Sequence, residues 1–514
     1  MPSESDGPSP ESLPEPLSSN GASRPQEPPK PIVGIGASAG GVEALQEFLE
    51  AVPADTDIAV VVVLHLGDSQ ESKLTEVLQQ ATTLPLEKAE DGTRVQGGRG
   101  YVIPAGSQLR IEGGVLRVDG SGEVPRTSTI DHFFRSLAAD QGDNAVGVVL
   151  SGTGTDGTLG LRAIKEAAGA TFVQAPEAAT YDHMPQSAIA TGLVDVTGPA
   201  PDLAEKLLEY RDNAGAIQLP DAESALGQEQ LSVLEKIFSR LYTQAGHDFS
   251  GYKRSTTFRR LERRMQLRSI TSLEAYLRLL RRDDEEVEAL KKDLLITVTS
   301  FFRDPAAFEA LQDRVFPEMV EQKDPTESVR VWVPACATGE EAYSLAILLL
   351  EQFDRPGTSP HLQVFATDVD EDAIQFARQG RYPESIEADV SAERLDRFFQ
   401  PDESHYRVTP RLRERIVFAE QDLLTDPPFS NLDLVSCRNV LIYLQSEMQR
   451  RALRRVHYSL RGEGYLFLGR SETPTQQADL FSLVDEAHNL HRARTLPEEQ
   501  VPVPPLGHPE AGGR

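Results

Sequence analysis

Three polar residues, each placed after an apolar stretch, are of the types that carry out nucleophilic catalysis. They are Ser38, which stands in a glycine-rich turn, His65, which follows residues 58–64, and Asp156, which lies in a glycine-rich loop. A serine hydroxyl becomes nucleophilic when an adjacent base accepts its proton and a third group orients that base. The three residue types therefore indicate a serine hydrolase, provided that the fold brings them together.

The glycine-rich turn has a second interpretation. Gly34, Gly36 and Ala39 also match a dinucleotide-binding fingerprint. That use of the turn requires an acidic residue at the end of the next strand, where it would bind a ribose hydroxyl. The next strand ends on His65, which suits a serine nucleophile better. Taken singly, the three residues would also be ordinary as a helix-capping serine, a strand-end histidine and a turn aspartate.

A second candidate site lies in the C-terminal half. The apolar stretch 329–333 leads into a loop that contains Gly339 and then into a helix, and the stretch 361–367 ends on Asp368. In such an arrangement the loop lets a ligand approach the backbone, and the acid binds paired hydroxyls. The glycine fingerprint of a dinucleotide site is absent here. The pattern therefore favours S-adenosylmethionine, which has a ribose but no pyrophosphate.

The elements that would position these residues alternate between strands and helices. This alternation over residues 31–199 and 294–494 predicts an α/β protein with two doubly wound, Rossmann-like domains. Residues 200–228 are predicted to be a closing helix and linker, and residues 229–293 a helical subdomain that precedes the second domain. The polar tails 1–30 and 495–514 are predicted to be disordered.

Composition excludes several classes of protein. The formal net charge of −29 argues against general nucleic-acid binding. No apolar run is long enough to span a bilayer, and no secretory signal is present, so we expect a cytoplasmic protein without membrane insertion. Cys336 and Cys437 are expected to be reduced thiols, and we assign no metal ligands.

One segment of this acidic chain is strongly basic. Its cations are Lys253, Arg254, Arg259, Arg260, Arg263, Arg264 and Arg268. A solvated helix face would explain such a run. A docking face for an acidic partner would explain it equally, because charged surfaces pair with surfaces of complementary potential.

The motifs of the first third resemble the catalytic domain of CheB, the chemotaxis receptor methylesterase. The resemblance covers about 31–199 and rests on Gly-Ala-Ser-x-Gly-Gly at 36–41, the strand ending in histidine, the stretch 101–106 and the Gly-x-Asp-Gly loop. It implies that Ser38 is the nucleophile, His65 the general base and acid, and Asp156 the orienting carboxylate. Such enzymes usually carry a receiver domain ahead of the esterase; thirty residues are too few for one, so we expect no receiver here.

Residues 226–494 resemble CheR, the receptor glutamate methyltransferase, through the stretches 297–304, 338–341 and 433–443. The resemblance implies a small β insertion between 382 and 418, and it places Arg303 and Tyr443 beside the transferred methyl group, where they position the substrate carboxylate. It implies these residues as the contacts of S-adenosylmethionine: Thr297, Thr299, Arg303, Glu341, Asp368, Asp422, Leu423, Cys437 and Arg438. Which of Glu341 and Asp368 binds the ribose and which the amino-acid group stays open.

Three positions depart from the CheR pattern. That family often has asparagine at the positions of Thr297 and Asp422, and glycine at the position of Ala335. A methyl group at 335 would crowd the cofactor loop. None of the three differences removes a reacting group.

Together the two resemblances predict a bifunctional chemotaxis-type enzyme that forms glutamate methyl esters on a receptor and hydrolyses them, with glutamine deamidation as a further activity. The expected partners are chemoreceptor cytoplasmic helices, or a similar acidic helical protein, and a histidine-kinase signalling protein. One alternative is a signalling scaffold in which one half is catalytically weak. Another is a pair of small-molecule enzymes, against which the basic segment argues. Opposed activities would cycle futilely unless a partner or occlusion of one site biases them.

Overall fold

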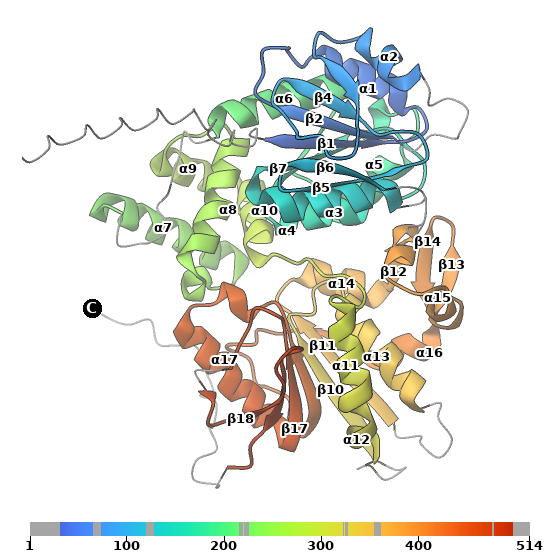
Figure 1. Cartoon of the computed structure of the whole chain (residues 1–514). Coiled ribbons are helices and arrows are strands. Elements are labelled where there is room, and N and C mark those ends of the chain that lie inside the picture. Colours follow the sequence, from blue (N-terminus) through green and yellow to red (C-terminus); the bar gives the residue numbers. More distant parts are fainter. Residues whose placement is uncertain are drawn as a thin grey trace, which may run out of the picture.

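The computed structural model describes residues 31–64, 73–119, 128–214, 219, 226–321, 323, 327–353, 361–474 and 477–496. His65, the tail 1–30, nearly all of the tail predicted at 495–514 and most of the linker 215–225 lie outside these residues. Figure 1 shows two α/β units, one above the other, with a group of helices beside them. None of the described helices combines the length and the apolar composition needed to cross a bilayer.

The upper unit is built on a seven-stranded parallel sheet in the order β3-β4-β2-β1-β7-β8-β9. Its strands are β1 (Ile32–Ala37), β2 (Ala59–Leu64), β3 (Leu86–Lys88), β4 (Arg99–Val102), β7 (Ala145–Val149), β8 (Ala170–Gln174) and β9 (Val196–Gly198). The central strands are buried along their whole length. Such strands form from continuous apolar runs because helices cover both faces of a parallel sheet.

Two layers of helices cover this sheet. On one face lie α1 (Gly41–Glu50), α2 (Leu74–Gln79) and α6 (Ala200–Asn213), whose apolar residues share a core with the strands. On the other face lie α3 (Thr129–Gln141), α4 (Thr158–Glu166), α5 (His183–Ala190) and the hairpin of β5 (Gln108–Glu112) and β6 (Val115–Asp119). The sheet is therefore enclosed, and its loops alone are left to carry chemistry.

The lower unit is a seven-stranded mixed sheet in the order β15-β11-β10-β16-β17-β19-β18, in which β19 runs antiparallel to both of its neighbours, β17 and β18. Its strands are β10 (Ser328–Pro334), β11 (His361–Asp368), β15 (Ile416–Glu420), β16 (Leu432–Cys437), β17 (Leu460–Leu468), β18 (Phe481–Asp485) and β19 (Leu490–Ala493). Its helices are α11 (Pro305–Arg314), α12 (Phe316–Glu321), α13 (Glu340–Phe353), α14 (Glu371–Gln379), α16 (Pro410–Arg413) and α17 (Ser446–Ser459).

The predicted β insertion is present. It consists of β12 (Arg381–Pro383), α15 (Ala392–Phe398), β13 (Phe399–Asp402) and β14 (His405–Val408), and its strands form a separate three-stranded sheet. The insertion also reaches the upper unit, because Arg135 of α3 makes a bidentate ion pair with Asp389 at 2.7 and 2.9 Å. The fold class predicted from the sequence is thus confirmed.

Four helices form the group beside the two sheets (Figure 1). They are α7 (Gln228–Ala245), α8 (Arg254–Leu267), α9 (Leu273–Leu280) and α10 (Asp284–Leu295), and they enclose an apolar core of their own. Helix α8 packs on one side against α10, and on the other it contacts α6 of the upper unit.

A buried cluster of four charges joins these helices to the upper unit. Lys165 of α4 donates to Asp195 at 2.5 Å and to Asp293 of α10 at 2.6 Å. Arg263 of α8 donates to the same two carboxylates, at 2.9 Å to Asp293. All four side chains are at most 7% exposed. Ions can be buried at this depth because each cation binds both anions.

This cluster corrects one prediction from the sequence. Arg260, Arg263 and Arg264 do not form a docking face for an external partner, because all three are buried. Arg260 donates to the backbone carbonyls of Lys165 and Glu166 at 2.6 and 2.7 Å, and Arg264 pairs with Glu286 of α10. The basic segment therefore binds the chain itself, and its exposed cations are Lys253, Arg259 and Arg268.

We expect replacement of Arg263 by methionine to destabilise the protein by about 3–5 kcal/mol, because Asp195 and Asp293 would keep only Lys165 as a cation bound to both, with Arg264 3.9 Å from Asp195. Urea unfolding of the full chain measures the effect. The control is Arg259→Met, an exposed position in the same helix, which should change stability by less than about 0.5 kcal/mol. Equal stability of the two variants would contradict the role given to the cluster.

Candidate active sites

One candidate site is a pocket in the lower unit, at the carboxyl ends of its central strands. It encloses about 900 Å³ out to its open mouth. Strand β10 stands between β11 and β16, so the strand order reverses here, and such a switch point is where open α/β sheets bind ligands. The residues predicted from the sequence that line it are Thr297, Thr299, Arg303, Glu341, Asp368, Asp422, Leu423, Arg438 and Tyr443.

Cys437 is the predicted cofactor residue that does not line this pocket. Its side chain is fully buried in an apolar core at the end of β16. Successive side chains of a strand point to opposite faces, and the hydroxyl of the preceding residue, Ser436, donates to Glu341 at 2.7 Å. Ser436 therefore faces the pocket side and Cys437 does not. Cys336, in the loop after β10, lines the pocket instead.

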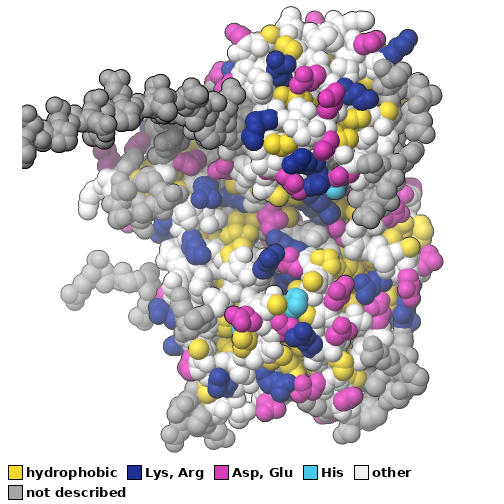
Figure 2. Space-filling model, in the orientation of Figure 1, with side chains coloured by type: hydrophobic (Ala, Val, Ile, Leu, Met, Phe, Trp, Pro, Cys, Tyr) yellow, Lys and Arg dark blue, Asp and Glu magenta, His cyan; other side chains and the backbone are white. Residues whose placement is uncertain are grey.

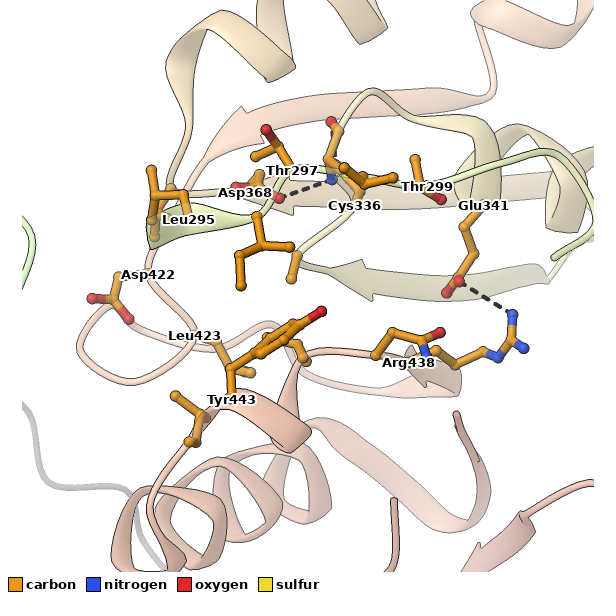
Figure 3. Close-up of a pocket in the computed structure, with 18 of the residues that line it drawn as sticks. Leu295, Thr297, Thr299, Cys336, Glu341, Asp368, Asp422, Leu423, Arg438 and Tyr443 are labelled. Carbon is orange, nitrogen blue, oxygen red and sulfur yellow. Dashed lines mark hydrogen bonds and ion pairs between the residues drawn. The ribbon is translucent and has the colours of Figure 1, made fainter. Parts of the chain in front are cut away.

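Charged groups stand at one end of the pocket. Arg438 pairs with Glu341 at 3.4 Å (Figure 3). Its Nη2 atom donates to Asp304 at 2.7 Å. Burial raises the pKa of the Glu341 carboxyl, while Arg438 and the hydrogen bond from Ser436 act to lower it. This end of the pocket therefore offers a buried carboxylate to a ligand cation.

Asp368 stands nearer the other end, which Asp422 closes in Figure 3. The Asp368 carboxylate accepts hydrogen bonds from the backbone N–H groups of Ala337 at 2.8 Å and Asp370 at 3.0 Å. Burial raises the pKa of the Asp368 carboxyl to about 6. The backbone N–H of Val369 also donates to it, so of the roughly four lone-pair sites of a carboxylate one remains for a hydroxyl of a ligand.

Several polar atoms of the pocket are buried without a protein partner. Within the part of the chain that the structure describes, Gln421 Oε1, Asn439 Oδ1 and Arg438 Nε have none. Buried polar groups are nearly always paired, so these atoms fit a pocket whose partners come from a polar ligand. Carboxylates at both ends and unpaired acceptors along the wall suit a nucleoside that carries an amino-acid group.

Two polar residues of the helical group that line the pocket were missed by the sequence analysis. His247 and Tyr252 reach it from the helical group, where the His247 Nε2 and the Tyr252 hydroxyl lie 3.0 Å apart. His247 also lies 3.6 Å from Asp422. Nothing in the spacing of either residue marks it, because both reach the pocket only through the packing of the helices on the lower unit.

The loop between β10 and α13 is strained. Its non-glycine residues Ala335 and Ala337 have φ angles of 55° and 47°, and Gly339 has 93°. Positive φ costs a residue with a Cβ roughly 1–2 kcal/mol. Ala335, the alanine that departs from the CheR pattern, therefore occupies a strained backbone conformation in the loop that borders the pocket.

Arg303 has a partner that the sequence did not reveal. Its Nη2 atom donates to Glu166 of α4, in the upper unit, at 2.5 Å. Burial and the charge of Glu166 both raise the pKa of Tyr443, to about 12. The side of the pocket formed by Arg303 and Tyr443 therefore faces the upper unit.

The second candidate site lies at the carboxyl edge of the upper sheet. Ser38 directly follows β1, and its N–H donates to the Ser151 carbonyl at 3.0 Å, which ties it to the end of β7. The register of β1 and β2 pairs Ala37 with Leu64, so the residues that follow each of them are Ser38 and His65. His65 lies outside the described residues, and its geometry stays a prediction.

Asp156 lies in the loop between β7 and α4, on the same edge of the sheet. Its carboxylate accepts from the backbone N–H groups of Ile130, Asp131 and Gly157, each at 2.9 Å. Burial raises the pKa of the Asp156 carboxyl and nearby Asp131 raises it further, while the three N–H groups act in the opposite direction. These bonds fix the carboxylate at the N-terminus of α3, where a negative charge is favoured.

Three family models match the chain: CheB methylesterase over residues 33–207, the all-alpha domain of CheR methyltransferase over 232–295, and the SAM-binding domain of CheR methyltransferase over 297–490.

Curated relatives match one or both halves. An uncharacterized 104.1 kDa protein of Rhodobacter capsulatus is 40% identical over 82% of this chain, which spans only 46% of that protein. A chemotaxis protein methyltransferase of Listeria monocytogenes is 32% identical over 46% of this chain and 87% of its own length. A protein-glutamate methylesterase/protein-glutamine glutaminase of Halobacterium salinarum is 36% identical over 38% of this chain and 58% of its own length.

We expect S-adenosylmethionine to bind less tightly as the pH falls through about 6, because the raised pKa of Asp368 lets its carboxyl gain a proton there. A protonated carboxyl is a poorer acceptor for a ribose hydroxyl, and affinity should fall by up to about tenfold per pH unit below that value. Calorimetric titration from pH 5 to 8 measures it. Asp368→Asn should bind weakly at every pH, whereas Glu371→Gln, at an exposed position of α14, should keep the wild-type profile. A wild-type affinity that does not change with pH would refute this.

We expect Ala335→Gly to raise the free energy of unfolding by about 1 kcal/mol, because glycine adopts a positive φ without the steric cost that alanine meets. Urea unfolding of the full chain measures the change. The matched control is Ala377→Gly, inside helix α14, which should destabilise the protein by about 1 kcal/mol or more. A loss of stability in Ala335→Gly would show that the loop is not strained at this residue.

Proposed function

Because the chain belongs to the CheB methylesterase and CheR methyltransferase families, we propose that it both forms and hydrolyses methyl esters of glutamate side chains on a chemoreceptor. The observation that carries the proposal is that one chain holds both sets of site residues. Ser38 and Asp156 lie at one edge of the upper sheet, and Glu341, Asp368 and Arg303 line the pocket of the lower unit.

In the methyltransferase half, we assign a ribose hydroxyl of S-adenosylmethionine to Asp368 and the amino group of its methionine part to Glu341. Two observations support this assignment: the two carboxylates stand apart in Figure 3, and Glu341 pairs with Arg438. The cofactor supplies an activated methyl group. Thr297, Thr299, Asp422, Leu423 and Arg438 would complete the contacts, with Cys336 in the place that the sequence analysis gave to Cys437.

Arg303 and Tyr443 would position the acceptor. A glutamate carboxylate is already ionised at neutral pH, so it needs no general base. The guanidinium of Arg303 is suited to bind one carboxylate oxygen and leave the other to react. The raised pKa of Tyr443 keeps its hydroxyl protonated and able to donate a hydrogen bond. The main contribution of the protein is then orientation of the two reactants.

In the esterase half, Ser38 would attack the ester carbonyl while His65 accepts its proton. His65 would then return that proton to the leaving methanol, and water would release glutamate from the acyl-enzyme. Asp156 would hold the histidine in the required tautomer, and its fixed position at the N-terminus of α3 supports this role. Deamidation of glutamine follows the same steps with ammonia as the leaving group.

We place this activity in the cytoplasm, at the helices of a chemoreceptor, with a histidine kinase of the same signalling system as a further partner. The test uses receptor-rich membranes and methyl-labelled S-adenosylmethionine, and compares the intact protein with Ser38→Ala. Label should enter the receptor, accumulate further with Ser38→Ala, and leave as methanol about a thousandfold more slowly. The control is Ser136→Ala, at a serine in the middle of α3 whose hydroxyl donates to the Phe133 carbonyl of α3 and accepts from the Ile111 N–H of β5.

Two results would count against the proposal. If neither the intact protein nor Ser38→Ala transfers label although S-adenosylmethionine binds, the lower unit is a cofactor-binding module. The signalling-scaffold alternative is then favoured. If label enters the receptor but Ser38→Ala and Ser136→Ala release methanol equally fast, the methyltransferase assignment stands and the esterase assignment fails.

A further inference from the structure

Helix α4 of the esterase half ends beside the methyltransferase pocket. Its last residue, Glu166, accepts a hydrogen bond from Arg303 at 2.5 Å. The two side chains are 29% and 26% exposed, so the ion pair lies at a partly open edge and not deep in the interface. Burial acts to lower the pKa of Arg303, but the carboxylate of Glu166 reverses this effect and the pKa is raised. Arg303 thus already holds a glutamate carboxylate.

The position of that carboxylate is the second observation. Glu166 lines an open pocket of about 490 Å³, counted out to its mouth, that shares Val298, Thr299 and Arg303 with the cofactor pocket. After burial, the charge of Glu166 is the largest cause of the raised pKa of Tyr443. The charge of Glu166 therefore acts on Arg303 and Tyr443, the two residues to which we assign the positioning of the acceptor. It does so from the side on which the cofactor pocket meets the adjoining pocket.

The carboxylate is also presented by a fixed helix end. Arg260 donates to the backbone carbonyls of Lys165 and Glu166, which lie in the last turn of the helix, where carbonyls lack intrahelical partners. The Lys165 carbonyl also accepts from the backbone N–H of Ala168 at 3.1 Å. Earlier in α4, Arg162 donates to Glu340 at 2.7 Å, at the start of α13. The contacts of Arg303, Arg260 and Arg162 with one helix thus hold Glu166 against the methyltransferase half. Figure 2 shows Lys and Arg side chains along the seam between the two units.

We propose that Glu166 is an internal occupant of the acceptor site, in which its side chain takes the place of the receptor glutamate that would be methylated. The occupant and the acceptor have the same chemistry, a glutamate side chain carried on a helix. An external helix must then displace Glu166 from Arg303 before it is methylated, so the esterase half limits access to the methyltransferase. This inference rests on the proposed function and identifies what competes with its substrate.

The test compares Glu166→Ala and Glu166→Gln with Glu50→Ala, all in the full chain and in the Ser38→Ala background, which retains the label. Glu50 is the matched control because it is exposed and is the last residue of α1. With receptor-rich membranes and methyl-labelled S-adenosylmethionine, Glu166→Ala should lower the KM for the membranes about three- to fivefold. Glu166→Gln should show a smaller change, because its amide can still accept from Arg303, and kcat should stay constant.

A second measurement does not depend on turnover. In the presence of S-adenosylhomocysteine, Glu166→Ala should co-sediment with the same membranes at about a three- to fivefold lower concentration than Glu50→Ala. Without cofactor or membranes, amide hydrogen exchange at the end of α4 should be faster in Glu166→Ala, because the ion pair no longer holds that turn. Label found on Glu166 itself would place its carboxylate at the reacting position and would also support the proposal.

The proposal is overturned if both Glu166 variants match Glu50→Ala in KM, in co-sedimentation and in exchange at α4. That result leaves the proposed function standing, provided that the membranes take up label. If no protein labels the membranes although the cofactor binds, the proposed methyl transfer fails, and co-sedimentation and hydrogen exchange alone decide whether Glu166 occupies the site.

Discussion

The relation between the two halves depends on the buried cluster of Lys165, Asp195, Arg263 and Asp293. Charges are buried at a large desolvation cost that only close, complete pairing offsets. Because each carboxylate binds both cations, a small sliding of α4 along α8 would leave charges unpaired. Apolar packing alone tolerates such displacement far better. The cluster therefore sets the position of α4, and with it the wall that the esterase half contributes beside the methyltransferase pocket.

The sequence was sufficient to predict the site residues that lie at the carboxyl ends of parallel strands. Continuous apolar runs identify the central strands because helices cover both faces of such a sheet. The carboxyl ends of neighbouring strands then meet at one edge. This rule placed Ser38 and Asp156 together on the upper sheet and Asp368 at the pocket of the lower one. The motifs that resemble CheB and CheR supplied the roles, which strand positions alone do not distinguish.

The sequence was insufficient wherever a side chain meets a partner far away along the chain. It showed that α8 is basic, but not that Arg260 would bind a helix end of the other half. It did not show that His247 reaches the pocket, or that Glu166 faces Arg303. Such contacts depend on how finished domains dock, and docking leaves no periodic pattern. The case of Cys437 is different, since its side chain lies in an apolar core and not in the pocket lining, and the sequence does not show which face of a strand a side chain takes.

Helix α4 begins next to one active site and ends next to the other. Asp156 and Gly157 immediately precede its first residue, and Glu166 is its last. At 1.5 Å per residue its nine residues span only about 13 Å, so a short rigid rod connects the two centres. A ligand that shifts this rod at one end must do work against the contacts at the other. If occupancy of one centre does shift the rod, thermodynamic reciprocity requires that occupancy of the other centre changes the affinity of the first by the same factor.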